Sequence, residues 1–220
     1  LASNYSLSSG TFDVTVKNVT LVGRRAYDGT TSVNSSNISS TFTGLAGSET
    51  LTLSGSGSVA SKNVAAGQSV TIGSIVIANG TGVASNYSLT SATLDITQRP
   101  ISLSGTRVYD ATSTASSSDL TTLTNLVGSE TLVLSNSGTV SNANVGTDKT
   151  VTIGSLSLGD GSNGGLSSNY TLSGGTHTLS VTKRPVTISG SRVYDGTAIV
   201  SNSSIDTFNN RAGSETLSLT

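Results

Sequence analysis

The sequence predicts an all-β protein of tandem small modules, sandwich-like or β-grasp-like, each of about 82 residues, joined by short junctions into a rod. Two observations lead to this prediction. Blocks of sequence recur in a fixed order, and within each copy apolar and polar residues alternate with the period of a strand. Glycine, serine and threonine separate the alternating segments, as expected of short strands joined by turns.

The repeat is defined by three blocks that contain tyrosine, aspartate or glutamate. Copies of Ser-Asn-Tyr lie 82 and 83 positions apart, at Tyr5, Tyr87 and Tyr170. The blocks Arg-x-Tyr-Asp and Gly-Ser-Glu-Thr-Leu recur at nearly the same interval, with their marker residues at Tyr27, Tyr109 and Tyr194, at Asp28, Asp110 and Asp195, and at Glu49, Glu130 and Glu215. Because one copy contains no finer self-similarity, each is predicted to be a small domain rather than a rung of a solenoid.

Arg-Pro pairs mark the junctions between copies, at Pro100 and Pro185. Proline cannot donate a backbone hydrogen bond, so each is expected at the edge or start of a strand. The junctions divide the chain into the tail of one repeat, two whole repeats and the first part of another, with boundaries at 1–17, 18–98, 99–183 and 184–220. The lack of methionine predicts that the chain belongs to a longer one, whose neighbouring repeats are its first partners.

Alternation of apolar and polar residues locates the clearest strands. They are Thr93–Thr97, Ile101–Ser104, Thr131–Leu134, Thr150–Ile153 and Thr176–Val181. This pattern predicts that one face of each strand lies on a core and the other in water. Residues 119–126 are the one segment expected to form a short turn of helix.

Composition and charge exclude several classes of function. The formal net charge is -1, from 11 basic and 12 acidic side chains, which gives no footprint for nucleic acid or an anionic membrane. With no cysteine, neither a disulfide nor a thiolate metal site is expected. No apolar stretch is long enough for membrane insertion of this segment.

The six tyrosines occupy only two positions of the repeat and allow two interpretations. Exposed rings would form a ladder of carbohydrate-stacking or self-association sites along the chain. Buried rings would instead complete small cores that have no tryptophan, with each hydroxyl reaching a polar partner. The second interpretation is favoured, because a core of this size must use its few aromatic residues efficiently.

The recurring acidic residues also have structural interpretations. Asp-Gly-Thr suits a turn in which the carboxylate accepts nearby backbone N–H groups. Each glutamate is expected to pair with the recurring arginine (Arg25, Arg107, Arg192) or to cap a turn. At Asp110 the following residue is Ala111 instead of glycine, which weakens any requirement for positive φ at that position.

No catalytic, cofactor or metal site is expected. His177 is the sole histidine and is not repeated, so no Ser-His-Asp triad or histidine-based metal site recurs. A calcium site would need clustered oxygen ligands, but Asp160 stands alone in its glycine-rich loop and its counterpart is Asn79. We therefore expect that the protein is not an enzyme.

These blocks together resemble the YDG-type repeat of very large bacterial surface proteins. The matching residues are Val-Tyr-Asp-Gly-Thr at Tyr194, Gly-Leu-Ala-Gly-Ser-Glu-Thr-Leu at Glu49 and Ser-Asn-Tyr-Ser-Leu at Tyr87, with Arg-Pro junctions at Pro100 and Pro185. The resemblance covers the whole chain. It implies the repeat region of a filamentous-haemagglutinin-like adhesin, secreted or displayed on the bacterial surface, and it brings no enzymatic residues.

Two functional hypotheses follow. The first is a stalk or spacer segment that extends a distal binding region from the cell. The second is a repeat module that itself binds glycan or matrix, or pairs edge to edge with like chains into an extracellular fibre or filament, so that like chains or extracellular polysaccharide would be further partners.

Overall fold

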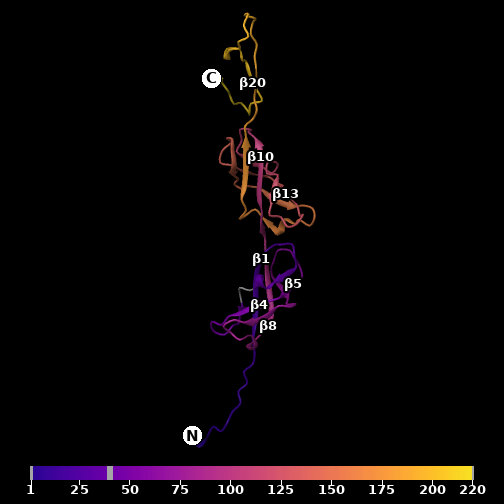
Figure 1. Cartoon of the computed structure of the whole chain (residues 1–220), viewed down its shortest axis with the longest axis vertical. Helices are drawn as coiled ribbons and strands as arrows, with labels where there is room; N and C mark the ends of the chain where they lie inside the picture. The colour runs from indigo at the N-terminus through magenta and orange to yellow at the C-terminus, as the bar shows by residue number, and fades with distance from the viewer. Residues whose placement is uncertain (1, 39–41, 220) are drawn as a thin grey trace. The chain divides into compact units, whose positions relative to one another are not determined.

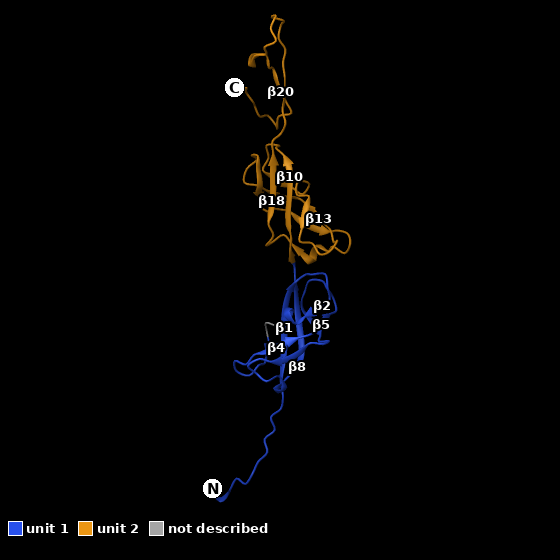
Figure 2. Cartoon of the chain, viewed as in Figure 1, with its two compact units in different colours: residues 1–98 blue, residues 99–220 orange. Residues whose placement is uncertain are grey.

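The computed structural model describes residues 2–38 and 42–219, and the chain divides into two compact units, Leu1–Gln98 and Arg99–Thr220 (Figures 1 and 2). Residue 1 of the predicted segment 1–17 and residue 220 of the predicted segment 184–220 lie outside the described part. Within that part, helix is limited to α1 (Ser35–Ile38) and four three-residue turns, Ala2–Asn4, Ala84–Asn86, Ser167–Asn169 and Asn202–Ser204. The predicted all-β class is confirmed.

The main sheet of unit 1 has the strand order β2-β5-β6-β8-β1-β3. Its strands are β1 (Lys17–Ala26), β2 (Ser32–Asn34), β3 (Phe42–Thr43), β5 (Ser56–Val59), β6 (Ala65–Thr71) and β8 (Tyr87–Thr97). A separate antiparallel ribbon pairs β4 (Leu51–Ser54) with β7 (Val76–Asn79). The first and last long strands, β1 and β8, are parallel neighbours, and β6 pairs antiparallel with the other edge of β8.

Alternating residues of β1 and β8 form the core of unit 1. Val19 and Leu21 of β1 and Leu94 and Ile96 of β8 are fully buried, whereas their neighbours along each strand are more exposed. This is the period-two pattern that the sequence predicts for a sheet with one face on a core. The short helix α1 adds Ile38 to the same core.

Unit 2 repeats this arrangement in a four-stranded sheet with the order β12-β10-β18-β15. Its strands are β10 (Ser102–Val108), β12 (Thr122–Thr124), β15 (Gly146–Thr150) and β18 (His177–Thr182). The remaining strands pair two by two: β9 (Arg99–Pro100) with β17 (Tyr170–Thr171), β11 (Thr114–Ser116) with β14 (Ser137–Thr139), β13 (Leu132–Ser135) with β16 (Ser157–Asp160), and β19 (Thr187–Ser189) with β20 (Thr207–Asn209). Again β10 and β18 are parallel neighbours.

We call β1–β8 the first module and β9–β18 the second module. In a β-sandwich both sheets are antiparallel, whereas each of these modules places its first and last long strands side by side in parallel. Parallel neighbours require a long crossover between them, and here the crossover contains all the other strands of the module. This parallel pair distinguishes both modules from a sandwich of two wholly antiparallel sheets.

Two local predictions are wrong. Within 119–126 the chain forms strand β12 instead of helix, and the turn lies just before it, at Ser117–Asp119. Of the strand predicted at Thr150–Ile153, only Thr150 belongs to β15, and Thr152 makes an isolated bridge to Thr139. Beyond Thr150 the N–H of Val151 still donates to the carbonyl of His177 at 2.9 Å, and the chain then turns at Gly154, which has a φ of 57°.

Candidate functional site

The recurring residues form two kinds of contact, which we call the Arg–Asp–Thr turn and the Tyr–Glu contact. The Arg–Asp–Thr turn follows the first strand of each copy, at Arg25, Asp28 and Thr30 in unit 1. The Tyr–Glu contact joins the start of the last strand to the Gly-Ser-Glu-Thr segment, at Tyr87 and Glu49.

In the first module the Arg–Asp–Thr turn ties the end of β1 to the loop that follows. Asp28 Oδ1 accepts the backbone N–H and the hydroxyl of Thr30, both at 3.0 Å, as the Asp-Gly-Thr pattern predicts. Asp28 Oδ2 lies 3.0 Å from Nη1 of Arg25, whose side chain is only 7% exposed. The same guanidinium donates to the carbonyl oxygens of Thr30 and Ser32, each at 2.5 Å.

The second module and the partial copy after it repeat this turn. Arg107 lies 3.1 Å from Asp110, which accepts the backbone N–H of Thr112 at 2.9 Å. Burial acts to raise the pKa of Asp110, but the two hydrogen bonds from Thr112 and the charge of Arg107 outweigh it and lower the pKa. In the partial copy, a hydrogen bond from Arg192 and those from Thr197 likewise lower the pKa of Asp195.

The residue after the aspartate adopts a left-handed backbone in all three copies. Gly29 and Gly196 have a φ of 77°, and Ala111 has a φ of 65°. The expectation that alanine here argues against positive φ is therefore wrong. Ala111 keeps the turn because the carboxylate of Asp110 accepts the N–H of Thr112 and the guanidinium of Arg107 donates to the carbonyl of Thr114, which together hold the backbone that follows it.

The Tyr–Glu contact occurs inside both modules. The hydroxyl of Tyr87 donates to Glu49 and accepts the backbone N–H of Ala46 at 3.1 Å. In the second module the hydroxyl of Tyr170 donates to Glu130 at 2.6 Å and accepts the N–H of Val127 at 3.0 Å. Each tyrosine thus fastens the strand that it begins, β8 or β17, to a turn about 40 residues earlier.

These contacts correct the expected pairing of the recurring charges. The arginines pair with the aspartates of their own turn, and the carboxylates of Glu49, Glu130 and Glu215 each accept a tyrosine hydroxyl. The hydrogen bond to Glu49 is the main cause that raises the pKa of Tyr87, because the hydroxyl proton is held by a carboxylate. Sequence spacing alone did not show which recurring residues would meet across the fold.

The six tyrosines differ in environment. Tyr27, Tyr87 and Tyr170 are buried, as the interpretation of core tyrosines requires, and Tyr109 is half-buried with its hydroxyl donating to Glu215. Tyr5 and Tyr194 are 85% and 88% exposed, and each lies in a segment without strand structure. A ring at these positions is therefore buried only where its copy of the sheet surrounds it.

The Arg-Pro junctions are held by an asparagine about 25 residues later. Arg99 Nε donates to the carbonyl of Asn125 at 2.7 Å, and Asn125 Nδ2 donates to the carbonyl of Pro100 at 2.6 Å. Arg184, Pro185 and Asn210 repeat the same contacts at 2.7 and 2.8 Å. Pro100 lies in β9, and Pro185 precedes β19.

Sequence reasoning missed a glycine that recurs two residues before each arginine, at Gly23, Gly105 and Gly190. A Cβ atom at Gly23 would lie 2.2 Å from Ile38 Cγ2, and one at Gly105 would lie 1.7 Å from the carbonyl oxygen of Asp119. A short segment of each module, residues 37–38 or 119–120, therefore packs directly on the glycine backbone, and we call it the crossing segment. The signal was available, because all three copies have glycine at this position.

These contacts join strands and turns of one chain. Within residues 2–38 and 42–219, no group of three acidic or histidine side chains could hold a metal ion. In the same part of the chain, no helix has the length and apolar character needed to cross a membrane. His177 is buried in the second module, and its Nε2 lies 2.8 Å from the carbonyl oxygen of Leu172.

Comparison with known families identifies the repeat. The family model described as the YDG domain matches the chain twice, over residues 11–94 and 95–180. No curated protein and no solved structure matches the chain. The two matches lie in tandem and together cover more than half of the sequence.

Proposed function

Because this chain belongs to the YDG domain family and carries two tandem copies of the domain, we propose that it is a spacer segment. In this proposal the modules form part of the stalk of a bacterial adhesin, secreted or anchored at the cell surface, and hold a distal binding region away from the cell. The modules act as structure and carry out no catalysis. Their main partners are neighbouring repeats of the same chain.

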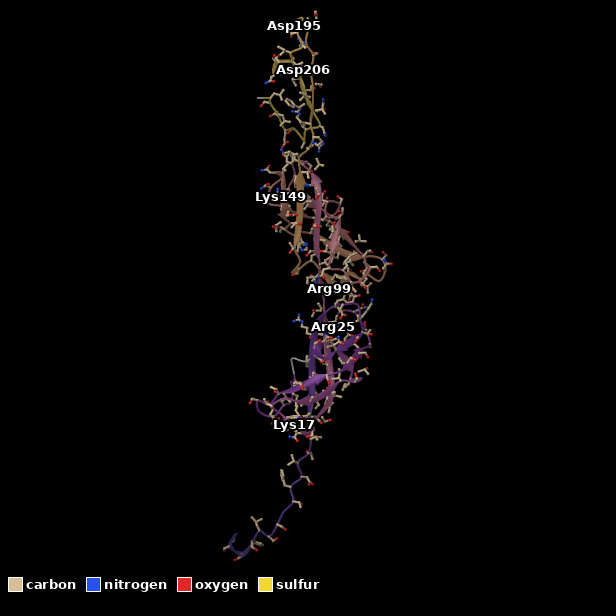
Figure 3. The ribbon with its side chains drawn as sticks, viewed as in Figure 1. Lys17, Arg25, Arg99, Lys149, Asp195 and Asp206 are labelled. Atoms are coloured by element: carbon tan, nitrogen blue, oxygen red, sulfur yellow. The ribbon has the colours of Figure 1, made fainter. Side chains whose placement is uncertain are left out.

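The observation that carries this proposal is the parallel pairing of the first and last strands. In the first module Lys17 pairs with Tyr87 and Ala26 pairs with Thr97. The chain therefore enters the module at one end of β1 and leaves it at the opposite end of β8. Figure 3 marks Lys17 and Arg25 near the two ends of β1. The ten residues of β1 span about 33 Å at roughly 3.3 Å per residue, so the first module adds this strand length to the path of the chain.

The second module supports the same function, because its first and last long strands are also parallel neighbours. Leu103 pairs with His177 and Val108 pairs with Thr182, so the chain again enters and leaves at opposite ends of the sheet. Only residues 183–186 separate β18 from β19, the first strand of the next copy. Short connections of this kind leave little chain outside the modules, which favours a spacer over a flexible linker.

A surface-display experiment tests the spacer function. The chain is placed between a membrane anchor and a fluorescent tag, and the height of the tag above the cell membrane is measured by interference microscopy. Removal of residues 18–98 should lower the tag by about one strand length, roughly 30 Å. A matched control replaces residues 18–98 with a Gly/Ser linker of the same number of residues. Its r.m.s. end-to-end distance is roughly 50 Å, so the linker is expected to give a more variable height rather than a lower one. Equal heights for all three chains, or a native chain found only in the cytoplasm, would contradict the proposal.

The second candidate function is recognition of a polysaccharide or of like chains by the repeat itself, and it would need exposed aromatic rings. In the two modules Tyr27, Tyr87 and Tyr170 are buried and Tyr109 is half-buried, so these rings are not available to stack on a sugar. The burial of the tyrosines therefore favours the spacer over this function. Binding of the unmodified chain on a glycan array would support recognition of a polysaccharide, and absence of binding would count against it.

A further inference from the structure

We propose that each module has a mechanical function: its parallel pair of first and last strands bears tension along the chain, loaded in shear. This inference rests on the proposed spacer function, since only a tethered chain with a distal load experiences such tension. It goes further by naming the pair of strands that resists extension, β1 with β8 in the first module and β10 with β18 in the second.

The direction of the load follows from the strand register. Tension pulls the start of β1 at Lys17 and the end of β8 at Thr97 in opposite directions. Because the two strands are parallel, this pull slides one strand along the other instead of opening the ladder from one end. Ten residue pairs of β1 and β8 then resist together, with a single irregularity between Val19 and Thr20.

Further hydrogen bonds add to the resistance of this pair. Thr97 Oγ1 donates to the carbonyl of Arg25 at 3.2 Å, and the N–H of Tyr27 donates to the carbonyl of Thr97 at 2.8 Å, so the loaded end of β8 is fastened to the end of β1. At the other end, Thr90 Oγ1 donates to the carbonyl of Val19 at 3.3 Å. Sliding would also expose the buried side chains that β1 and β8 contribute to the core.

The other strands of the first module lie outside the direct path of the load. The ribbon of β4 and β7 belongs to the crossover, and neither strand continues into a chain end of the module. The edge strand β2 pairs only with β5. Substitutions there can lower stability at equilibrium, but they leave the strand pair that bears the load intact.

In the second module the same pair is shorter and interrupted. Six residue pairs join β10 and β18, and two more join β9 and β17. Between the two ladders, residues 172–176 leave the strand, with Gly174 at a φ of 81°. The end of β18 is still held to the end of β10 by two hydrogen bonds. Thr182 Oγ1 donates to the carbonyl of Arg107 at 3.2 Å, and the N–H of Tyr109 donates to the carbonyl of Thr182 at 2.9 Å.

Pulling the first module along two directions tests the proposal directly. The chain has no cysteine, so introduced cysteines provide unique attachment points for single-molecule force measurements. Handles at Lys17→Cys and Gln98→Cys load β1 and β8 in shear, and handles at Lys17→Cys and Ser88→Cys open the same pair from one end. We expect the shear geometry to unfold at roughly twice the force or more, because its hydrogen bonds break together. Equal forces in the two geometries would overturn the proposal.

A matched pair of core substitutions separates mechanical resistance from general stability. Val19 in β1 and Val33 in β2 are both completely buried, and Val→Ala removes the same atoms from each. Val19→Ala should lower the unfolding force in the shear geometry, whereas Val33→Ala should leave it near the unmodified value. An equal loss of force in both variants would show that force follows stability alone, and would overturn the assignment of the load to β1 and β8.

The outcome of the pulling experiment can be told apart from the outcome of the surface-display experiment. A large difference between the two pulling directions, together with a failed surface-display test, would keep the mechanical pair and remove the spacer function. A successful surface-display test with no dependence on pulling direction would keep the spacer and remove the mechanical pair.

Discussion

The two modules share one repeat but differ in the continuity of the last strand. In the first module β8 runs without a break through 11 residues. In the second module the equivalent stretch is divided into β17, of two residues, and β18, of six. The parallel ladder is correspondingly continuous in one module and divided in the other.

A two-residue insertion causes this difference. Leu94 follows Tyr87 by seven positions, whereas its counterpart Leu179 follows Tyr170 by nine. Both leucines nevertheless pair with the recurring glycine of the first strand, Gly23 or Gly105. The extra residues are therefore absorbed around Gly174, and the register of the core is restored beyond them. The comparison teaches that the packing at the glycine determines the register, and that an insertion shortens the ladder without shifting it.

The largest effect is expected from a side chain at the recurring glycine. Gly23→Val and Gly105→Val would each force the crossing segment away from the sheet, and we expect a loss of more than about 3 kcal/mol in the free energy of unfolding of the affected unit. Hydrogen exchange measured by mass spectrometry would show the loss in one unit at a time. Gly10→Val is the control, because no atom lies within 4 Å of the position where its Cβ would stand. Normal protection in Gly23→Val would contradict the role assigned to this glycine.

Removal of the tyrosine hydroxyl should have the next largest effect, and a larger one in the second module. Tyr170→Phe removes the hydrogen bond to Glu130, which is buried, and should cost about 1–3 kcal/mol. Tyr87→Phe should cost less, because Glu49 is half-buried and can be hydrated. Thermal unfolding by calorimetry measures both, with the exposed Tyr5→Phe as the control. A larger loss of unfolding free energy in Tyr87→Phe than in Tyr170→Phe would contradict this prediction.

Deletion of Gly174 and Gly175 tests whether the insertion causes the divided strand. The shortened second module has the spacing of the first, so β17 and β18 should join into one strand. We expect a gain of about 1 kcal/mol, since two flexible residues no longer have to be ordered. Slower amide exchange at residues 172–176 would show the new ladder. Unchanged exchange there would mean that another feature, such as the contact of His177 with Leu172, divides the strand.

The backbone after the recurring aspartate should give a smaller difference. Ala111→Gly relieves a left-handed alanine and should stabilise unit 2 by about 0.5–1 kcal/mol. Gly29→Ala introduces the same strain into unit 1 and should destabilise it by about 1 kcal/mol. Denaturant unfolding followed by circular dichroism measures the pair. Changes of the same sign in the two variants would contradict the assigned backbone strain.

The smallest effect is expected in acid. The pKa of Asp110 is lowered in the folded protein from the ordinary value of 3.8, so its contribution to stability is complete above pH 3.8 and is lost as the pH falls through the folded pKa. Asp110→Asn should therefore flatten the acid side of the stability profile of unit 2. Asp13→Asn, in an exposed segment outside the sheets, should leave that profile unchanged. If the stability of unit 2 falls in acid as steeply in Asp110→Asn as in the unmodified chain, the contribution assigned to Asp110 is wrong.

Local patterns in the sequence were sufficient for several parts of the structure. The alternation in β8 and β18 predicted strands with one buried face, and Asp-Gly-Thr predicted a turn closed by the carboxylate. These features depend on residues within a few positions of one another. Of the strand predicted at 150–153 only Thr150 belongs to β15, because the extent of a strand depends on its pairing, here with β18, which local alternation does not contain.

The sequence by itself determined the repeat, its period, its all-β class and the residues that recur in every copy. Only the tertiary structure decided which of those residues meet: Tyr87 with Glu49 instead of arginine with glutamate, and Gly23 with the segment that crosses above it. It also decided that the first and last strands are parallel neighbours. The physical reason is that period-two alternation shows which face of a strand is buried but carries no information on the partner or direction of that strand, which depend on packing between residues some 70 positions apart.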